Sequence, residues 1–366
     1  MEYITIEECC DILDSRRIPI TASERRSGPY PYYGANGIQD YVAEYIFDDE
    51  LVLLAEDGGN FGSKTRPIAY RVSGKCWVNN HAHVLKPMAN MDVDYLCYSL
   101  MFYDTEELVN GATRQKLTQA AMRKMLIPQR PITEQKKIVS ELSKIQSIIS
   151  ARQQQLQNLD DLVKARFVEL FGDPISNSHA LPEATLPELG EFGRGVSKHR
   201  PRNDPKLLGG KYPLIQTGDV ASANLYITSY TTTYSELGLA QSKIWGKGTL
   251  CITIAANIAK TAILNFDACF PDSIVGFTAN GRTNNIFIHY WFSFFQEILE
   301  SQAPESAQKN INLKILSELK VIVPSKEKQD AFAAFVEQVD KLKAAVQKAL
   351  DETQLLFDSL MQKYFG

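Results

Sequence analysis

Residues 132–172 read ITEQKKIVSELSKIQSIISARQQQLQNLDDLVKARFVELFG, and they predict one long helix. Their apolar residues recur at steps of three and four, or at multiples of seven, which is typical of a helix that pairs with another helix. Thr133 is predicted to cap its start, and Gly172 followed by Asp173-Pro174 to end it. At about 1.5 Å per residue the helix is roughly 57 Å long, so its apolar stripe needs a partner. The stripe consists of Ile138, Leu142, Ile145, Ile149, Leu156, Leu159, Val163 and Leu170.

The partner is predicted at the other end of the chain. Residues 325–366 read SKEKQDAFAAFVEQVDKLKAAVQKALDETQLLFDSLMQKYFG and repeat the pattern of residues 132–172 at an offset of 194. Gln135 and Gln329 match at this offset, and so do the Phe-Gly pairs at 171–172 and 365–366. The chain is therefore predicted to contain a two-fold internal repeat. The second stripe consists of Phe332, Val336, Val339, Val346, Leu350, Phe357, Leu360 and Tyr364.

The two helices are predicted to pack antiparallel, because each must return toward the start of the other domain. Polar residues interrupt both stripes, at Arg152 and Arg166 in the first helix and at Lys343 and Thr353 in the second. These residues either extend to solvent or select the register and orientation of the pair. Aligning Pro128 with Pro324 makes the connection before the second helix two residues shorter, which predicts a slightly different entry angle for that helix.

Composition indicates a globular protein of 366 residues with two or three domains, since 44% of its residues are hydrophobic. Its six cysteines have no metal-binding spacing and no CxxC motif, and we find neither a signal peptide nor a membrane-length apolar run. We therefore expect a reduced, cytoplasmic protein without a membrane partner. The cysteines are Cys9, Cys10, Cys76, Cys97, Cys251 and Cys269.

Net charge is −4, so composition alone gives no argument for nucleic-acid binding. One stretch, RGVSKHRPRNDPKLLGGK at 194–211, carries six Lys or Arg against one Asp. It is either a solvated loop or a mobile loop that meets phosphates, with Lys198, Arg200 and Arg202 as its candidate contacts.

The predicted fold is α+β, with two strand-rich globular domains separated by two long, antiparallel coiled-coil helices. The domains are residues 1–129 and 173–323, and the helices are residues 130–172 and 324–366. Each half has the same order: strands, a helix, a short helix, an apolar strand with proline, and the long helix. The first half is expected to be helical over residues 92–124, and the second to form strands around YPLIQTGDV (212–220).

Several polar groups are candidates for binding. GGNFGSKT at 58–65 nearly matches a phosphate-binding loop, but Ser63 replaces the required glycine. A turn-rich loop that offers Lys64 and Arg66 to DNA phosphates is the preferred interpretation. Asn79, Asn80, His81 and His83 are weighed as metal ligands, as turn formers and, for the asparagines, as readers of adenine. No third metal ligand has a clear spacing, so no metal is predicted.

The remaining candidates lie in loops. Gln216 and Thr217 follow one apolar strand, and Asn257 and Lys260 follow another; turn chemistry and base reading are both compatible with them. Arg16 and Arg17 lie in a polar loop. Arg114, Gln115 and Lys116 precede a short helix, and Gln308, Lys309 and Asn310 do so in the second half, which indicates an equivalent loop, structural or phosphate-binding, in each half. Glu134-Gln135-Lys136 has the ExK shape of some nuclease sites but is interpreted as charge at a helix start. No methyl-transfer motif and no glycine-rich cofactor loop is found, which agrees with a non-catalytic chain.

The whole chain resembles the DNA-specificity (S) subunits of type I restriction–modification systems. The resemblance is carried by the order and spacing of several segments together rather than by one motif. They are IPQRPITEQKKIVSEL (127–142), LVKARFVELFGD (162–173), YPYYGANGIQDYV (30–42), LLAEDGG (53–59), WVNNHAHVL (77–85), YPLIQTGDV (212–220), KGTLCITIAANIAKTAIL (247–264) and DSIVGF (272–277).

The resemblance implies a chain that does no chemistry itself. Each globular domain would read one half of a split, asymmetric site on double-stranded DNA, and the paired helices would set the unread spacer. Two methyltransferase (M) subunits would dock on the helices and methylate adenine at N6 with S-adenosylmethionine. A restriction and translocase (R) subunit would add ATP- and Mg-dependent nuclease activity, so no cofactor is expected in this chain. The alternatives are a coiled-coil adaptor with two ligand-binding domains and no DNA role, and an enzyme without a visible motif.

Overall fold

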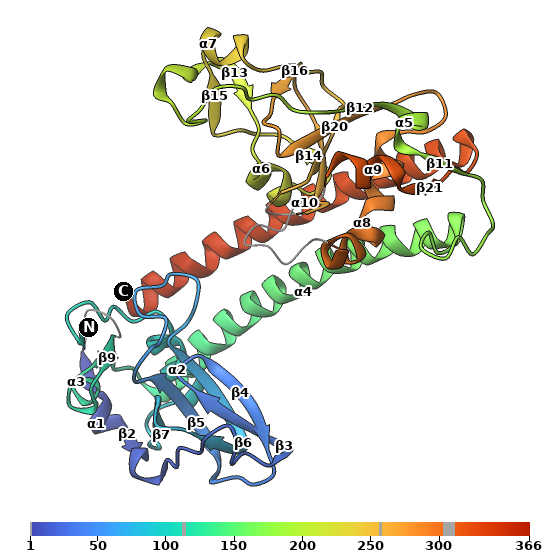
Figure 1. Cartoon of the computed structure of the whole chain (residues 1–366). Coiled ribbons are helices and arrows are strands. Elements are labelled where there is room, and N and C mark those ends of the chain that lie inside the picture. Colours follow the sequence, from blue (N-terminus) through green and yellow to red (C-terminus); the bar gives the residue numbers. More distant parts are fainter. Residues whose placement is uncertain (1, 112–114, 256–257, 303–311) are drawn as a thin grey trace. The chain divides into compact units, whose positions relative to one another are not determined.

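The computed structural model describes residues 2–111, 115–255, 258–302 and 312–366 (Figure 1). The chain divides into two compact units. The first unit comprises Met1–Gln153 with Lys348–Gly366, and the second comprises Gln154–Gln347. Each unit therefore contains one globular domain and a part of both long helices. The predicted domain limits follow elements of secondary structure rather than contacts, and they stay a prediction.

A six-stranded sheet forms most of the first globular domain, in the order β2-β7-β5-β6-β3-β4. Its strands are β2 (Cys10–Ile12), β3 (Ser27–Gly34), β4 (Gly37–Val42), β5 (Phe47–Ala55), β6 (Ala69–Val78) and β7 (Ala82–Pro87). The run Leu51–Ala55 of β5 is fully buried, as expected for a central apolar strand. Neighbouring strands are antiparallel except β3 and β6, which pair in parallel at Tyr32 and Trp77. The strand order of this sheet therefore differs from that of a simple meander, in which strands adjacent in sequence are neighbours in the sheet.

Helix α2 (Val93–Met101) packs against β5 and β6 and is capped by Asp92, whose side chain accepts from Asp94 N and Tyr95 N. The predicted helical region 92–124 is broken after α2. A short hairpin of β8 (Val109–Asn110) and β9 (Lys116–Leu117) follows, and then α3 (Gln119–Arg123). Periodicity does not predict this hairpin, because each of its strands has only two residues. A 3-10 turn, η1 (Asp14–Arg16), follows β2.

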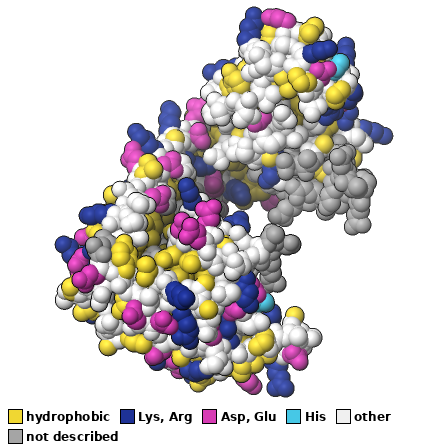
Figure 2. All heavy atoms as spheres, turned by 90° about the vertical axis from the view of Figure 1, so that its left-hand side faces the viewer, with side chains coloured by type: hydrophobic (Ala, Val, Ile, Leu, Met, Phe, Trp, Pro, Cys, Tyr) yellow, Lys and Arg dark blue, Asp and Glu magenta, His cyan; other side chains and the backbone are white. Residues whose placement is uncertain are grey.

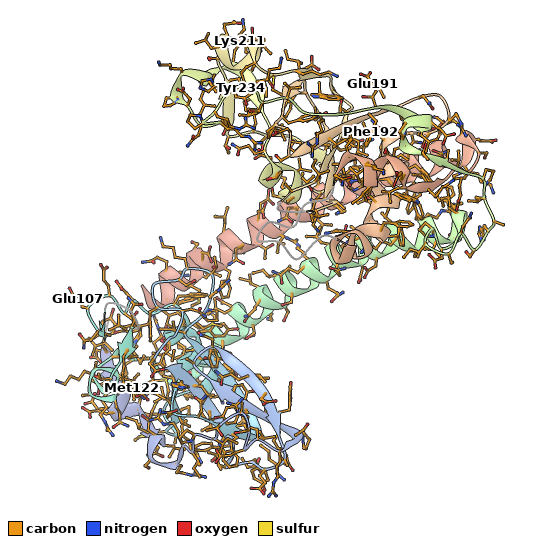
Figure 3. The ribbon with its side chains drawn as sticks, in the orientation of Figure 1. Glu107, Met122, Glu191, Phe192, Lys211 and Tyr234 are labelled. Atoms are coloured by element: carbon orange, nitrogen blue, oxygen red, sulfur yellow. The ribbon has the colours of Figure 1, made fainter. Side chains whose placement is uncertain are left out.

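Two sheets form the second globular domain, in the orders β12-β20-β17-β18-β14 and β15-β13-β19-β16. The prediction of a strand over YPLIQTGDV is wrong in its second half, where α6 (Thr217–Ser222) begins directly after Ile215-Gln216. Lys211 and Tyr234 lie on the paired strands β13 and β15 (Figure 3). The strands are β12 (Gly190–Arg194), β13 (Leu208–Leu214), β14 (Tyr226–Ile227), β15 (Thr232–Tyr234), β16 (Ile244–Trp245), β17 (Leu250–Thr253), β18 (Thr261–Leu264), β19 (Ala268–Cys269) and β20 (Ile274–Ala279).

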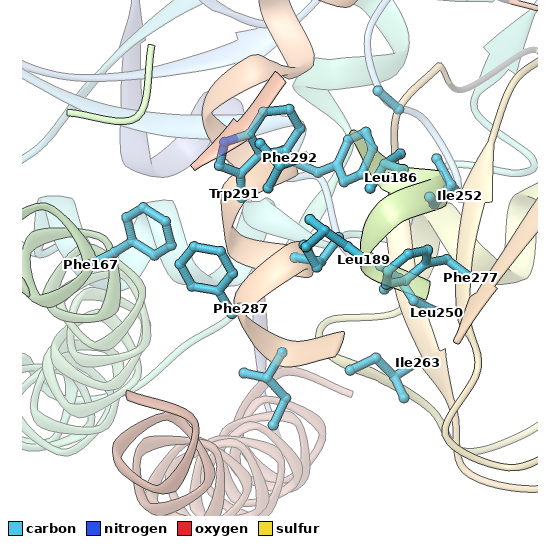
Figure 4. Packing of buried hydrophobic residues seen from close by; sticks show 14 of the residues in the cluster. Phe167, Leu186, Leu189, Leu250, Ile252, Ile263, Phe277, Phe287, Trp291 and Phe292 are labelled. Atoms are coloured by element: carbon cyan, nitrogen blue, oxygen red, sulfur yellow. The ribbon is translucent and has the colours of Figure 1, made fainter. Parts of the chain in front are cut away.

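The core of the second unit joins the five-stranded sheet to helices (Figure 4). Leu250 and Phe277 of the sheet face the one-turn helix α5 (Leu186–Leu189), while Phe287 of α8 (Asn285–Gln302) stands beside Phe167 of the first long helix. The rings of Phe167 and Phe287 are stacked with centroids 5.4 Å apart. Two short elements complete this unit, η2 (Pro205–Leu207) and α7 (Glu236–Ala240).

Each unit also contains a hub, which we define as a short strand, a one-turn helix, and a second strand that pairs with the first. The first hub is β1 (Tyr3–Thr5), α1 (Ile6–Cys9) and β10 (Leu126–Pro128). The second is β11 (Glu183–Thr185), α5 and β21 (Lys320–Ile322), preceded by α9 (Leu313–Glu318). Both strand pairs are antiparallel, with Ile4 opposite Ile127 and Ala184 opposite Val321. The internal repeat is therefore structural as well as sequential.

The long helices are α4 (Ile132–Phe171) and α10 (Lys326–Phe365), each of 40 residues and offset by 194 at both ends. Thr133 does not cap α4, because the helix begins one residue earlier and Pro131 O accepts from Glu134 N and Gln135 N. The shorter second connection predicted from the two prolines is wrong, because both helices begin four residues after their hub strand ends. Pro128 ends its hub strand, whereas Pro324 lies two residues beyond the end of its own, so the two prolines are not equivalent. The different entry angle stays a prediction. Gly172, with φ +77°, ends α4 as predicted.

Antiparallel pairing of the helices is confirmed within each unit. In the first unit, Tyr364 Oη donates to Glu141 while Arg152 donates to Ala349 O and Thr353 Oγ1, so the numbering falls along α10 as it rises along α4. In the second, Lys343 Nζ lies 2.5 Å from Asp160 Oδ1 and the ring centroid of Phe332 lies 5.4 Å from that of Phe167, so the two helices again run in opposite directions. Three of the four polar interruptions thus form hydrogen bonds or an ion pair with the opposite helix, which favours their role in register. Arg166 pairs with Glu169 on its own helix, and its guanidinium lies 6.0 Å from the ring centroid of Phe335 on the opposite helix.

The residues predicted for helix pairing lie on the inner faces of α4 and α10, but many of them also contact the globular domains. Ile138, Leu142, Ile149 and Phe357 join the core that contains α2, and Val163, Phe332, Val336 and Val339 join the core that contains α8. Ile145, Leu156, Val346 and Leu350 are half-buried. No described helix combines the length and apolar content that a bilayer crossing requires.

Candidate nucleic-acid interface

In the first unit, connections from four parts of the chain meet in what we call the first loop cluster: residues 35–36, 56–66, 79–81 and 115–117. Asn36 Nδ2 donates to Gly58 O over 2.9 Å, and Gly58 N donates to Gln115 O over 3.2 Å. Glu56 N donates to His81 O over 2.9 Å. These bonds fix segments that are far apart in sequence into one surface, so polar side chains on any of them can meet the same ligand.

A buried network of charged groups holds the base of this cluster. Arg17 Nη1 lies 2.6 Å from Glu56 Oε2, and His83 Nδ1 lies 2.7 Å from Asp14 Oδ2. Gln119 Nε2 also donates to Asp14 over 2.8 Å. Burial raises the pKa of Asp14, but the hydrogen bonds with His83 and Gln119 lower this pKa by more than burial raises it. The net shift is therefore downward, and the carboxylate stays charged. Because Glu56 opens the 56–66 loop, the network anchors that loop to the sheet.

Asp14, Glu56 and His83 bring three possible metal-ligand atoms within 4.8 Å of one another. Their lone pairs are already engaged: Arg17 pairs with both carboxylates, Lys116 lies 3.0 Å from Glu56, and His83 Nε2 faces Leu117 O at 3.0 Å. Two neighbouring cations also oppose a third positive charge. The group therefore fits an internal ion network better than a metal centre.

Among the predicted contacts of the first unit, Lys64 and Arg66 are exposed on the loop cluster and form no ion pair with any residue that the structure describes. Asn80 is exposed at the neighbouring turn. Arg17 is instead committed to the buried network, and Arg16 donates to Ile46 O and lies 4.7 Å from the ring of Phe47. Lys64 and Arg66 are thus exposed and accessible to a ligand, whereas Arg17 is engaged in contacts that stabilise the fold.

Asn79 is 3% exposed, and its side chain bonds to Gln39 and to His81 N. It shapes the turn and is not free to reach a base in this state. His81 Nδ1 lies 2.6 Å from Asp57 Oδ1, and His83 is buried, so the asparagine–histidine motif does not converge on one point. Arg114 lies outside the described residues.

Sequence reasoning missed Asn36, which lies in the loop cluster. Asn36-Gly37 between two tyrosine-rich segments is a strong signal for a hairpin turn, and the structure has that turn between β3 and β4. Lys116 is predicted to lie in a structural or phosphate-binding loop, and the structure places its Nζ 3.0 Å from Glu56 Oε1.

In the second unit, the basic stretch 194–211 runs from the end of β12 across a loop and η2 into β13. Gln241 Oε1 accepts from Lys198 N over 2.7 Å and from His199 N over 3.0 Å, which fixes the middle of the loop. The side chains of Lys198, Arg200 and Arg202 are exposed. The stretch therefore presents cations from an ordered loop rather than from a free tail.

The other candidates of the second unit do not share one position. Gln216 precedes α6, and its backbone N–H donates to Asp219 Oδ2 over 2.8 Å, which is helix-capping chemistry. Its side chain is exposed, whereas Thr217 is half-buried. Lys260 is exposed in the connection from β17 to β18. Asn257, and likewise Gln308, Lys309 and Asn310, lie outside the described residues.

Charge on the visible face of each unit is mixed. Figure 2 shows Lys and Arg side chains interspersed with Asp and Glu, so the cations gather only locally. This agrees with the net charge of −4 and points to contacts at particular loops rather than to one continuous basic face.

The long helices carry a second apolar set outside the paired stripe. Ile148 is 45% exposed and Leu342 is 56% exposed, and these two positions are equivalent in the repeat. Leu162 and Leu356, at 48% and 52%, form a second equivalent pair. In each helix the two residues are separated by fourteen residues, or two heptads, so they lie on one face. The first unit contains Ile148 and Leu356, and the second contains Leu162 and Leu342. Each unit thus exposes one of these repeat-equivalent apolar residues from each helix, and Leu355 and Val168 are further exposed apolar residues of the first and second unit, respectively.

Comparisons with known proteins identify the family. The chain matches the type I restriction modification DNA specificity domain family over residues 1–160 and 183–353. A Haemophilus influenzae protein named as a type I restriction enzyme specificity subunit is 25% identical over 362 residues, which cover 96% of this chain and 90% of that protein. This match spans both units and both helices.

Solved structures show the same fold. The S subunit of a type I restriction–modification system from M. genitalium has a TM-score of 0.62 at 17% identity, covering 100% of this chain and 96% of that one. A chain from a study of complex assembly and conformational transition in a type I system has a TM-score of 0.57 at 17% identity, covering 100% and 97%. The adaptor alternative is not supported by these relatives. The chain belongs to the type I restriction–modification DNA specificity family, as a non-catalytic subunit with a DNA sequence-specificity role.

Proposed function

We propose that each globular domain reads one half of a split, asymmetric site on double-stranded DNA. The observation that carries this proposal is the contrast between two matching hubs and the two different loop surfaces attached to them. In the first unit, Lys64, Arg66 and Asn80 are exposed; the two cations would contact phosphates, and the Asn80 amide would pair with adenine. In the second, the exposed side chains of Lys198, Arg200 and Arg202 would contact phosphates. Two different surfaces would read two different half-sites.

The long helices are proposed to set the spacer between the half-sites. Each has 40 residues, which corresponds to about 60 Å of continuous helix. Buried glutamines attach each helix to a globular domain: Gln135 Nε2 donates to Asn90 O and Gln329 Nε2 donates to Arg282 O. A continuous helix fixed in this way at its start would transmit its length and its turn to the DNA spacing.

The exposed apolar residues Ile148 and Leu356 of the first unit, and Leu162 and Leu342 of the second, are proposed as docking positions for two copies of one partner. A surface that occurs twice by the internal repeat can bind the same partner twice. In this family context the partners are methyltransferase subunits, with a restriction and translocase subunit completing the complex. S-adenosylmethionine, ATP and Mg would then be bound by those partner chains. Ile148 with Leu356, and Leu162 with Leu342, would each be covered by one methyltransferase.

The reading function is tested by mapping adenine methylation. The chain is co-expressed with its neighbouring methyltransferase in a host that lacks adenine methylases. We expect a split, asymmetric methylated motif that disappears when this chain is omitted. If both proteins are soluble and co-purify but no chain-dependent methylation occurs, the proposed reading function is wrong.

The docking proposal is tested by stoichiometry. The variant Ile148→Glu with Leu356→Glu places two charges on the exposed pair of the first unit, and native mass spectrometry should show loss of one methyltransferase copy. Gln155→Glu, at an exposed polar position of α4, is the matched control and should keep both copies. Two bound copies in the double variant would contradict this assignment of the docking surface.

A further inference from the structure

Two arginines of the basic loop in the second unit pair with a carboxylate from another segment of the same unit. Arg200 Nη2 lies 3.4 Å from Asp272 Oδ2, and Arg202 Nη2 contacts Asp272 Oδ1. Asp272 lies in the connection between β19 and β20, about seventy residues away in sequence. One carboxylate therefore accepts from two guanidinium groups, which is an arrangement that a phosphate group can also satisfy.

Main-chain contacts hold the loop and Asp272 together. Gly195 N donates to Ile274 O over 2.9 Å, and Val196 N donates to Phe270 O over 3.1 Å. A Cβ on Gly195 would lie only 2.3 Å from Phe270 O, so the close approach requires glycine. The segment that precedes the arginines is thus laid along the segment that carries Asp272, and the pairing does not depend on the side chains alone.

The Arg200 guanidinium is also positioned from its other side. Its Nη1 donates to Ser197 O over 2.6 Å and to His199 O over 2.8 Å. The side chains of Arg200 and Arg202 are nevertheless 54% and 45% exposed, and that of Asp272 is 35% exposed. Exposed ion pairs contribute little to stability, so Asp272 is an acceptor that can be replaced. Lys198, also exposed, forms no ion pair with the described part of the chain and adds positive charge beside the arginines.

We propose that Asp272 is a resident acceptor that a DNA backbone phosphate displaces from Arg200 and Arg202. This inference rests on the proposed DNA-reading function. Asp272 keeps both arginines in a ready geometry, and it lowers the affinity for any duplex because a phosphate must take its place. Since phosphate contacts carry no sequence information, Asp272 tunes the strength of binding and leaves the choice of bases to other residues.

The test uses the complete complex with its methyltransferase partner and measures binding to two duplexes, one with the mapped site and one with a scrambled site. Asp272→Asn should bind both duplexes about two- to fivefold more tightly, because the competing exposed ion pair is weak. The dependence of log affinity on log salt should become steeper by about 1, and the ratio between the two duplexes should stay constant.

Two further variants make the test specific. Glu318→Gln removes the same charge from another exposed ion pair of this unit, with Lys314 at 3.8 Å, and should leave affinity unchanged. In the Arg200→Gln, Arg202→Gln background, adding Asp272→Asn should have no effect, because the groups for which Asp272 competes are gone. The same thermal midpoint for all variants shows that the folds are intact.

Unchanged or weaker binding by Asp272→Asn, while the wild-type complex still prefers its site, would overturn this inference and leave the proposed function standing. A gain in affinity that persists without the two arginines would overturn the inference equally. A wild-type complex that binds both duplexes alike would overturn the proposed function, and the inference with it.

Discussion

The two hubs use nearly the same contacts, whereas the sheets attached to them differ. Thr5 N donates to Glu8 over 2.9 Å in the first hub, and Thr185 N donates to Glu188 over 2.7 Å in the second. The first globular domain has one six-stranded sheet, and the second has sheets of five and four strands. The hubs, which attach the long helices, thus share one structure, whereas the sheets that carry the candidate binding loops differ between the two units.

Core packing at the helix starts gives the largest test of this comparison. Phe332 is fully buried, with its ring centroid 5.4 Å from that of Phe167 and 5.6 Å from that of Phe171, whereas the equivalent Ile138 meets an aliphatic and tyrosine-rich core. Phe332→Ala should lower the free energy of unfolding by about 3–5 kcal/mol and Ile138→Ala by about 2–4 kcal/mol. Urea denaturation measures both.

The comparison predicts that each cost falls on its own unit. Hydrogen exchange should show Phe332→Ala loosening the second unit and Ile138→Ala the first. Uniform loosening from either variant would mean that the helices couple the units into one cooperative body.

The buried glutamines refine the comparison, since they are the same residue in the same position of both repeats. Gln135 is 1% exposed and accepts from Asp92 N over 2.8 Å; Gln329 is fully buried and accepts from Thr283 Oγ1 over 2.8 Å. Replacing either by Leu leaves two main-chain carbonyls without their donor and one hydrogen-bond donor, Asp92 N or Thr283 Oγ1, without its acceptor, so we expect each variant to lower stability by about 1–3 kcal/mol.

Methylation mapping adds a readout beyond stability. If the glutamines orient the helices, each variant should relax the spacer length while keeping both half-site sequences. An altered half-site sequence with an unchanged spacer would assign the glutamines a role in base reading instead.

The two units should also differ in their stability at acid pH, and this is the smallest of the expected effects. Burial, with the charge of Lys343, lowers the pKa of His289 in the second unit to about 4 from 6.5. The unfolded chain therefore binds a proton first, and stability is lost as pH falls from 6.5 to 4, by about 1–2 kcal/mol at pH 5. In the first unit the lowered pKa of Asp14 stabilises the folded state, and this contribution is lost only as the pH falls below 3.8.

Fluorescence can follow the two units, because Trp77 belongs to the first and Trp245 and Trp291 belong to the second. Between pH 7 and 5, urea unfolding of the second unit should shift and that of the first should not. His289→Gln should remove the shift. A shift that survives this substitution would trace the acid sensitivity to another group.

The candidate site could be predicted only in part. Lys64, Arg66, Asn80 and the basic loop are exposed as predicted, because exposed loops follow from local turn signals. Arg17 and Asn79 have equally polar sequence surroundings but are engaged in structural contacts: Arg17 pairs with Glu56, which lies thirty-nine residues away, and Asn79 bonds to Gln39. The Thr-x-x-Glu capping box at 185–188 repeats that at 5–8, and this local signal marks the equivalent hubs in the sequence itself.

The two long helices, their offset of 194, their antiparallel pairing and the two-part plan could all be predicted from the amino-acid sequence. The helices follow from periodicity, the two-part plan follows from repetition, and the antiparallel pairing follows because each helix must return toward the start of the other domain. All three can be read along the sequence without knowing which loops meet. The three-dimensional fold was needed to show which cations are available, that Asp272 pairs with Arg200 and Arg202, and that two matching glutamines attach the helices. Those outcomes depend on pairs of groups far apart in sequence, whose meeting is set by sheet topology and burial rather than by spacing.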